Sequence, residues 1–235
     1  GGGGGGGGGG STAYKVLLVA GPQGTGRSEL VAKALLGAED AKDGAKLAAP
    51  KVATTRPPKD GEAESGKFVF LDRLSYDQQL RDGKFVTSDD PADNQGKAPW
   101  ARELTGLRLE DLLEAGSEGK VAVVDCADTN AADRVALALE ARSDVSLVGV
   151  WVSLSALADF EARLGSAGGK GGEGGEGELS EEDRRAALQA VIGDIEWGVL
   201  SGLFDFTVIN DDEPRALGEL QNAIDFLDRA AGGNP

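Results

Sequence analysis

Residues 14–37 read YKVLLVA GPQGTGRS ELVAKALLG, and this stretch decides the fold. The first seven residues are mostly apolar and partly β-branched, which predicts a short strand buried on both faces. The last nine residues predict a helix that ends at Gly37. The eight residues between them contain three glycines. A buried strand, a glycine-rich turn and a helix in this order predict a phosphate-binding loop (P-loop).

The turn matches the pattern G-x-x-x-x-G-K-[S/T], with Arg27 in place of the lysine. Its glycines let backbone N–H groups face a phosphate, and the helix N-terminus adds the positive end of a dipole. Arg27 keeps the charge of a lysine but not its compact shape. Ser28 would bind Mg²⁺ when a nucleotide is bound. The expected ATP- or phosphate-binding residues are Gly21, Gln23, Gly24, Thr25, Gly26, Arg27 and Ser28. A glycine-rich turn that binds nothing is the alternative.

Strand-like and helical patterns alternate along the rest of the chain. This alternation predicts an α/β fold of the P-loop NTPase type, with a parallel sheet flanked by helices. Residues 38–50 are expected to be loop, and residues 165–179 are expected to be a mobile glycine-rich loop. We expect strands at 51–55, 67–71, 84–86, 120–125, 145–152 and 204–211, and helices at 75–83, 107–116, 131–142, 155–165, 180–202 and 214–230.

Composition narrows the functional classes. The 235 residues carry a net charge of −16, which disfavours binding to nucleic acid. No apolar run reaches the roughly 18 residues of a membrane-spanning helix, so membrane insertion is not expected. The chain has no histidine and one cysteine, Cys126, which we expect to be buried; this excludes internal disulfides and His-based or four-cysteine zinc sites. The poly-glycine start and the absence of methionine are expected of a domain within a larger intracellular protein, which would be cytoplasmic or associated with the cytoskeleton or a membrane.

A second motif follows the glycine-rich turn. Residues 54–62 read TTRPPKDGE, and together with GPQGTGRS they resemble guanylate kinase and the guanylate-kinase-like domains of membrane-associated scaffold proteins. KFVFLD at 67–72, VAVVD at 121–125 and VIND at 208–211 add to this similarity. The resemblance implies a nucleoside monophosphate (NMP) kinase fold with an inserted NMP-binding lobe and a lid. The implied segments are a tail (1–12), core with P-loop (13–51), NMP-binding-like lobe (52–100), core (101–164), lid (165–187) and core (188–235).

The resemblance also implies roles for particular residues of the lobe. Arg56 matches an arginine that grips the GMP phosphate, Lys59 replaces a second arginine, and Phe68 replaces a tyrosine that binds the phosphate. Thr87 stands where a glutamate would recognise guanine. Three expected hydrogen-bonding groups are therefore changed.

The core and the lid depart from the family in a similar way. Asp125 matches the first aspartate of a D-x-D pattern and, with Arg27, is a candidate catalytic residue; Ala127 replaces the second aspartate, beside Asp128. The candidate lid arginines are Arg163, Arg184 and Arg185, while alanines occupy two positions, 167 and 187, where the family has arginine.

These changes favour a catalytically degenerate domain that acts as a protein-interaction or structural module, with a protein partner in the cleft of the lobe. One alternative is an active kinase that transfers phosphate from ATP·Mg²⁺ to GMP, in which Lys97, Asp128 and Arg184 or Arg185 compensate for the lost groups. A nucleotide-binding switch without turnover is the third hypothesis.

Overall fold

The computed structural model describes residues 14–40, 46–89, 103–167 and 180–232. Five parallel strands form the core sheet in the order β2-β7-β1-β8-β9. Their bounds are β1 (Tyr14–Ala20), β2 (Leu47–Ala48), β7 (Val121–Asp125), β8 (Val145–Ser153) and β9 (Phe206–Ile209). The predicted α/β class with a parallel sheet flanked by helices is confirmed.

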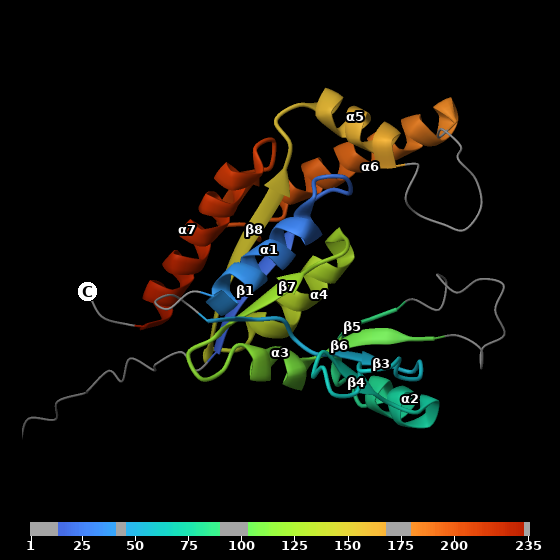
Figure 1. The fold of residues 1–235 in the computed structure, drawn as a ribbon, viewed down its shortest axis with the longest axis vertical. Helices are drawn as coiled ribbons and strands as arrows, with labels where there is room; N and C mark the ends of the chain where they lie inside the picture. The colour runs from blue at the N-terminus through green and yellow to red at the C-terminus, as the bar shows by residue number, and fades with distance from the viewer. Residues whose placement is uncertain (1–13, 41–45, 90–102, 168–179, 233–235) are drawn as a thin grey trace, which may run out of the picture.

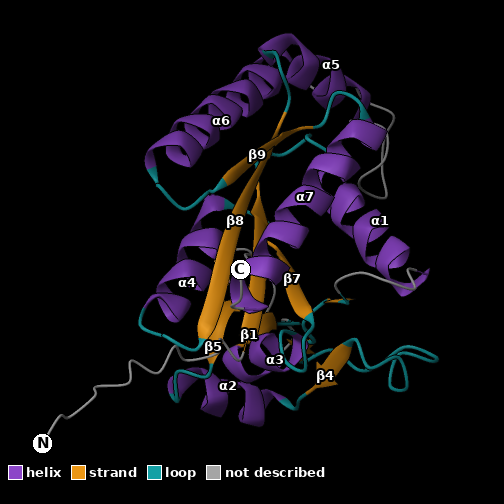
Figure 2. Cartoon of the chain, turned by 90° about the vertical axis from the view of Figure 1, so that its left-hand side faces the viewer, coloured by secondary structure: helices purple, strands orange, loops and turns teal. Residues whose placement is uncertain are grey.

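Alternation along β1 explains why the strand is apolar on both faces. Leu17 and Val19 face a core covered by α1 (Arg27–Asp40) and α7 (Glu213–Gly232). Val16 and Leu18 face a second core, covered by α3 (Leu109–Ala115), α4 (Thr129–Glu140) and α6 (Glu181–Leu200). Figure 2 shows helices on both sides of the core sheet. The core sheet is therefore buried on both faces, as a parallel sheet requires.

A second sheet lies beside the core sheet (Figure 1). It contains β3 (Val52–Thr54), β4 (Phe68–Phe70), β5 (Phe85–Ser88) and β6 (Thr105–Arg108) in the order β4-β3-β6-β5. The helix α2 (Arg73–Arg81) covers it through Tyr76, whose hydroxyl donates to the Thr105 carbonyl at 2.7 Å. The lobe thus has a small core of its own and contacts the main body through β5 and α4.

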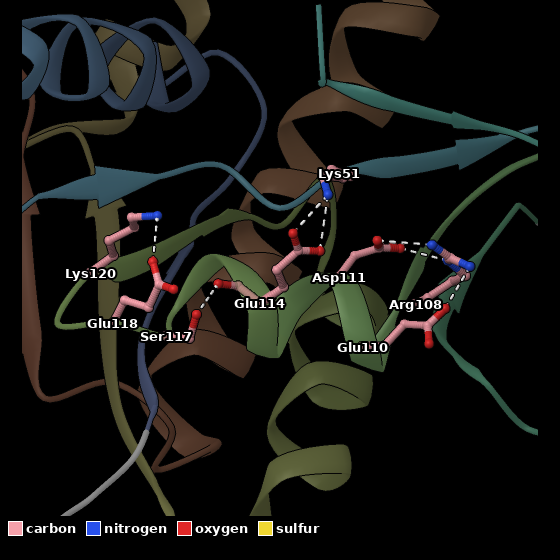
Figure 3. A network of polar contacts seen from close by, with 8 residues as sticks. All are labelled: Lys51, Arg108, Glu110, Asp111, Glu114, Ser117, Glu118 and Lys120. Carbon is pink, nitrogen blue, oxygen red and sulfur yellow. Dashed lines mark hydrogen bonds and ion pairs between the residues drawn. The ribbon is translucent and has the colours of Figure 1, made fainter.

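Carboxylates of α3 bind the chain at both crossings between the two sheets (Figure 3). Glu114 accepts hydrogen bonds from the ammonium of Lys51, at 2.8 and 3.0 Å, one residue before β3 begins. Asp111 accepts two bonds from Arg108, at 2.6 and 2.9 Å, where β6 ends. The Asp111 side chain is only 3% exposed and that of Arg108 only 11%, so this pair is buried. These hydrogen bonds and ion pairs at both crossings hold the second sheet against the core.

Some expected element bounds were wrong. The first helix continues past Gly37 to Asp40, and β2 lies within the expected loop 38–50. The segment expected to be a helix over 107–116 begins as the strand β6, because Gly106 and Leu107 pair with β3 and β5. The helix α5 (Leu157–Ala167) extends three residues into the expected loop 165–179, and the rest of that loop lies outside the described residues. None of the described helices combines the length and apolarity needed to cross a bilayer.

Candidate phosphate-binding site

The glycine-rich loop lies between the carboxyl end of β1 and the first turn of α1. Gly24 has φ +89° and Gly26 has φ +74°, a region that strongly favours glycine. A Cβ atom on Gly21 would lie 2.1 Å from the carbonyl oxygen of Val152, so the loop packs directly on β8. The α-helix begins with the bond from the Leu30 N–H to the Gly26 carbonyl at 3.0 Å. Glycine is therefore needed at three points of the loop for backbone shape and close packing.

Side chains of Thr25, Asn210 and Arg163 donate hydrogen bonds to backbone carbonyls of the loop. The hydroxyl of Thr25 donates to the Pro22 carbonyl at 3.0 Å. The carbonyl of Thr25 itself accepts from the Asn210 side-chain amide at 2.7 Å and from Arg163 at 3.1 Å. Thr25 is 1% exposed and Asn210 is 7% exposed, so these bonds are shielded from water.

Among the described residues, no protein acceptor is seen for the backbone N–H groups of residues 23, 24 and 26–28, whereas residues 22–25 form a turn that engages the Thr25 N–H. The carbonyls of Gly21, Pro22, Thr25 and Gly26, in contrast, accept hydrogen bonds from other groups of the protein. Backbone N–H groups at a helix N-terminus with no protein acceptor form a site for an anion. The loop can therefore hold a phosphate group with backbone donors alone.

Arg27 does not stand free beside this loop. Its Nε donates to the Asp125 carboxylate, and its Nη1 donates to the Gly21 carbonyl at 2.7 Å. The side chain is 10% exposed. Arg27 therefore closes the base of the loop between β1 and β7, and its charge is already compensated by a carboxylate. The structure brings together Arg27 and Asp125, the two candidate catalytic residues.

Further carboxylates surround this pair. Burial and the negative charge of Asp128 raise the pKa of Asp194 on α6, while the nearby Arg27 opposes the shift. Asp128 is the N-cap of α4 and accepts from the Ala131 N–H at 2.7 Å. The positive charge of Arg27 is thus surrounded by several carboxylates, which weakens its attraction for a phosphate group.

The loop offers one hydroxyl for a metal ion. Ser28 is exposed at the first turn of α1. Among the described residues, no group of three or more histidine, cysteine, aspartate or glutamate side chains could hold a metal. Mg²⁺ usually binds through few protein ligands together with substrate phosphates. The exposed Ser28 hydroxyl is the group that would bind an Mg²⁺ ion arriving with a nucleotide.

Arg56 forms a separate cluster on the lobe. Its guanidinium donates to both oxygens of Glu62, at 2.6 and 2.9 Å, and lies 4.8 Å from the ring centre of Phe68. The backbone N–H of Lys59 adds a bond to Glu62 at 2.8 Å. The bonds from Arg56 and from the backbone of Lys59 lower the pKa of Glu62 to about 2. Phe68 packs against Arg56 but offers no hydroxyl. The Glu62 carboxylate therefore binds the arginine that was expected to bind the phosphate of GMP.

A cleft of about 650 Å³ opens between the two sheets. Thr87, Asp89, Asp125, Asp128 and Arg134 are polar residues of its lining. The described lining does not include Arg56, Lys59 or Phe68. The structure therefore places Thr87 and Asp125 at the cleft and leaves the three residues expected to bind a monophosphate outside it.

The three candidate lid arginines lie on two different helices. Arg163 on α5 reaches the loop, whereas Arg184 and Arg185 lie in the first turns of α6. Arg185 is exposed; Arg184 is half-buried, and its Nε has no hydrogen-bond partner among the described residues. Lys97 lies outside the described residues, so its expected compensating role stays a prediction.

Comparisons with known proteins support the fold. No family model matches the chain, and no curated protein matches its sequence. The structure is similar to that of guanylate kinase from Anaplasma phagocytophilum, with 14% identity, coverage of 95% of this chain and 89% of that chain, and a TM-score of 0.51. A gluconokinase from Sinorhizobium meliloti 1021 also matches, with 14% identity, coverage of 93% and 94%, and a TM-score of 0.42. The chain has the fold of P-loop kinases; likeness at this identity does not extend to guanylate kinase activity.

Two residues of the site were not singled out from the sequence. Asn210 follows β9 at the edge of the sheet where the loop also lies, and the VIND segment contained it without indicating a role. Glu62 lies in the TTRPPKDGE motif, in which only Arg56 and Lys59 were expected to have a role. The position of an acidic residue six residues after Arg56 could have indicated the ion pair between Arg56 and Glu62.

Proposed function

We propose that this chain is a catalytically degenerate domain of P-loop kinase fold, which binds the polyphosphate of a nucleotide such as ATP with Mg²⁺ and does not phosphorylate GMP. The observation that carries this proposal is the set of backbone N–H groups at residues 23, 24 and 26–28, for which no protein acceptor is seen among the described residues. Backbone donors bind phosphate without a lysine, because the N–H groups and the helix dipole supply the positive potential.

We infer the absence of phosphoryl transfer from three arginines whose guanidinium groups already bind other groups of the protein. Arg27 is bound to Asp125, Arg56 to Glu62, and Arg163 to backbone carbonyls. Phosphoryl transfer depends on positioned cations that neutralise charge in the transition state. Each lost charge-assisted contact to phosphate removes about 1.5–3 kcal/mol. Loss of three contacts would then lower the rate by roughly three to six factors of ten.

Mg²⁺ would be held by the Ser28 hydroxyl and by the phosphates of the nucleotide. When bound, the ion would supply charge neutralisation to the polyphosphate. A protein partner for the cleft stays a prediction from the family resemblance, together with a scaffold role and an intracellular location.

Calorimetric titration tests the proposal. We expect ATP·Mg²⁺ to bind the whole chain, EDTA to weaken that binding, and AMP, which lacks the polyphosphate, to bind far more weakly. GMP should give no binding in the millimolar range, and a phosphotransfer assay on the same sample should detect no ADP. Formation of ADP and GDP would establish the alternative, an active kinase. Equal, weak heats for ATP·Mg²⁺ and AMP would contradict phosphate binding and leave a structural module.

A further inference from the structure

Asn210 and Arg163 bind one carbonyl of the loop from two distant parts of the chain. The Asn210 amide donates to the Thr25 carbonyl at 2.7 Å, and Arg163 Nη1 donates to the same oxygen at 3.1 Å. Arg163 Nη2 donates to the Asn210 carbonyl at 2.7 Å, and the Asn210 N–H donates to the Ser153 carbonyl at 2.8 Å. The Arg163 side chain is thus fixed to the Asn210 backbone, and the Asn210 backbone is fixed to β8, before any ligand binds.

The orientation of the peptide between Thr25 and Gly26 decides what the loop presents to an anion. In a trans peptide the carbonyl and the N–H point in opposite directions. Donors that hold the Thr25 carbonyl on the side of Asn210 therefore aim the Gly26 N–H to the other side. Rotation of this peptide by about half a turn would exchange that donor for a carbonyl oxygen, which repels phosphate.

Gly26 itself does not prevent such a rotation, because glycine populates positive and negative φ about equally. The hydrogen bonds to the Thr25 carbonyl must therefore select the orientation. A Cβ atom on Gly26 would lie 2.9 Å from the Asn210 Nδ2 atom and 3.6 Å from Arg163 Nη1, so both side chains close directly over this residue.

We infer that Asn210 and Arg163 are positioning residues that fix the Thr25–Gly26 peptide so that its N–H faces a bound phosphate. This inference rests on the proposed function, since it assigns the two residues to the same phosphate loop. It gives Arg163 a role different from that of a lid arginine that touches phosphate, because its guanidinium donates to the backbone carbonyls of Thr25 and Asn210.

The test compares Asn210→Ala, Arg163→Ala and Arg163→Lys with Arg215→Ala. Arg215 is an exposed arginine at the same end of β9 that does not contact Thr25, so its removal is the matched control for charge. We expect a loss of about tenfold in affinity for ATP·Mg²⁺ in the two alanine variants, partial recovery in Arg163→Lys, and no change in the control. The affinity for AMP should not follow this series.

A readout without ligand separates this inference from the proposed function. The backbone amide resonance of Gly26 reports the peptide orientation in the unliganded chain. We expect it to shift in Asn210→Ala and Arg163→Ala and to keep its position in Arg215→Ala. Folded alanine variants with an unchanged Gly26 resonance would overturn the positioning role. Failure of the wild-type chain to bind ATP·Mg²⁺, with the Gly26 shift present, would overturn only the proposed function.

Discussion

Replacing Gly26 with alanine should damage the phosphate loop, whereas the same change at Gly37 in α1 should not. The residue has φ +74°, where an alanine is disfavoured by about 1–2 kcal/mol. The new Cβ would also lie 2.9 Å from the Asn210 Nδ2 atom, so the amide must leave the Thr25 carbonyl, a loss of about 1 kcal/mol. Together these terms predict that Gly26→Ala lowers the free energy of unfolding by about 2–3 kcal/mol.

Gly37→Ala is the matched control, since it adds the same methyl group to the helix that follows the loop. Gly37 lies inside α1, and a Cβ there would meet no atom within 4 Å. Alanine in place of a helical glycine should stabilise the chain by about 0.5–1 kcal/mol. Urea unfolding of both variants measures these changes, and titration with ATP·Mg²⁺ should show weaker binding only for Gly26→Ala. A Gly26→Ala variant as stable and as competent in binding as the wild type would refute the account of the loop.

Three further predictions concern the rest of the molecule. Asp111→Asn should lower the free energy of unfolding by about 3 kcal/mol in denaturant titration, because it removes the buried carboxylate bound to the Arg108 guanidinium and leaves that guanidinium only the exposed carboxylate of Glu110; a change below 1 kcal/mol would contradict this. Burial raises the pKa of the Cys126 thiol to about 12, so a thiol reagent at pH 8 should modify the native chain far more slowly than the chain in urea, and equal rates would contradict the burial. The bond from Arg56 lowers the pKa of Glu62 from 4.5 to about 2, so its contribution to stability is complete above about pH 4.5 and is lost as the pH falls toward 2; the Glu62→Gln variant should lack this part of the acid dependence.

Local patterns were sufficient for most of the fold. The strand at 14–20, the glycine-rich turn and the following helix were predicted from one continuous stretch, because each element depends on neighbouring residues. The strand β6 was not, since Leu109, Leu112 and Leu113 have helical spacing and the expected helix was extended back to Leu107. Its conformation depends on the lobe, where a Cβ on Gly106 would lie 2.7 Å from the Phe85 ring and 2.8 Å from the Tyr76 hydroxyl. Only residues with small side chains fit there, and sequence spacing does not reveal such contacts.

The site shows the same division between local and distant information. The motif supplied the phosphate-binding stretch from Gly21 to Ser28, but not the partners of its side chains and carbonyls. Asp125 lies 98 positions from Arg27, and Asn210 lies 185 positions from Thr25. These pairings arise because the carboxyl ends of parallel strands meet at one edge of the sheet. A sequence pattern can indicate that an arginine is present, but not that a carboxylate already binds it.

The most direct test of the central claim is one sample of the whole chain, titrated first with ATP·Mg²⁺ and then with GMP, and assayed for ADP and GDP at the end. The account predicts that ATP·Mg²⁺ binds, that GMP does not bind in the millimolar range, and that neither ADP nor GDP forms. Micromolar binding of GMP with formation of both diphosphates would contradict it, because Arg56 would then have to leave Glu62 and serve a working monophosphate site.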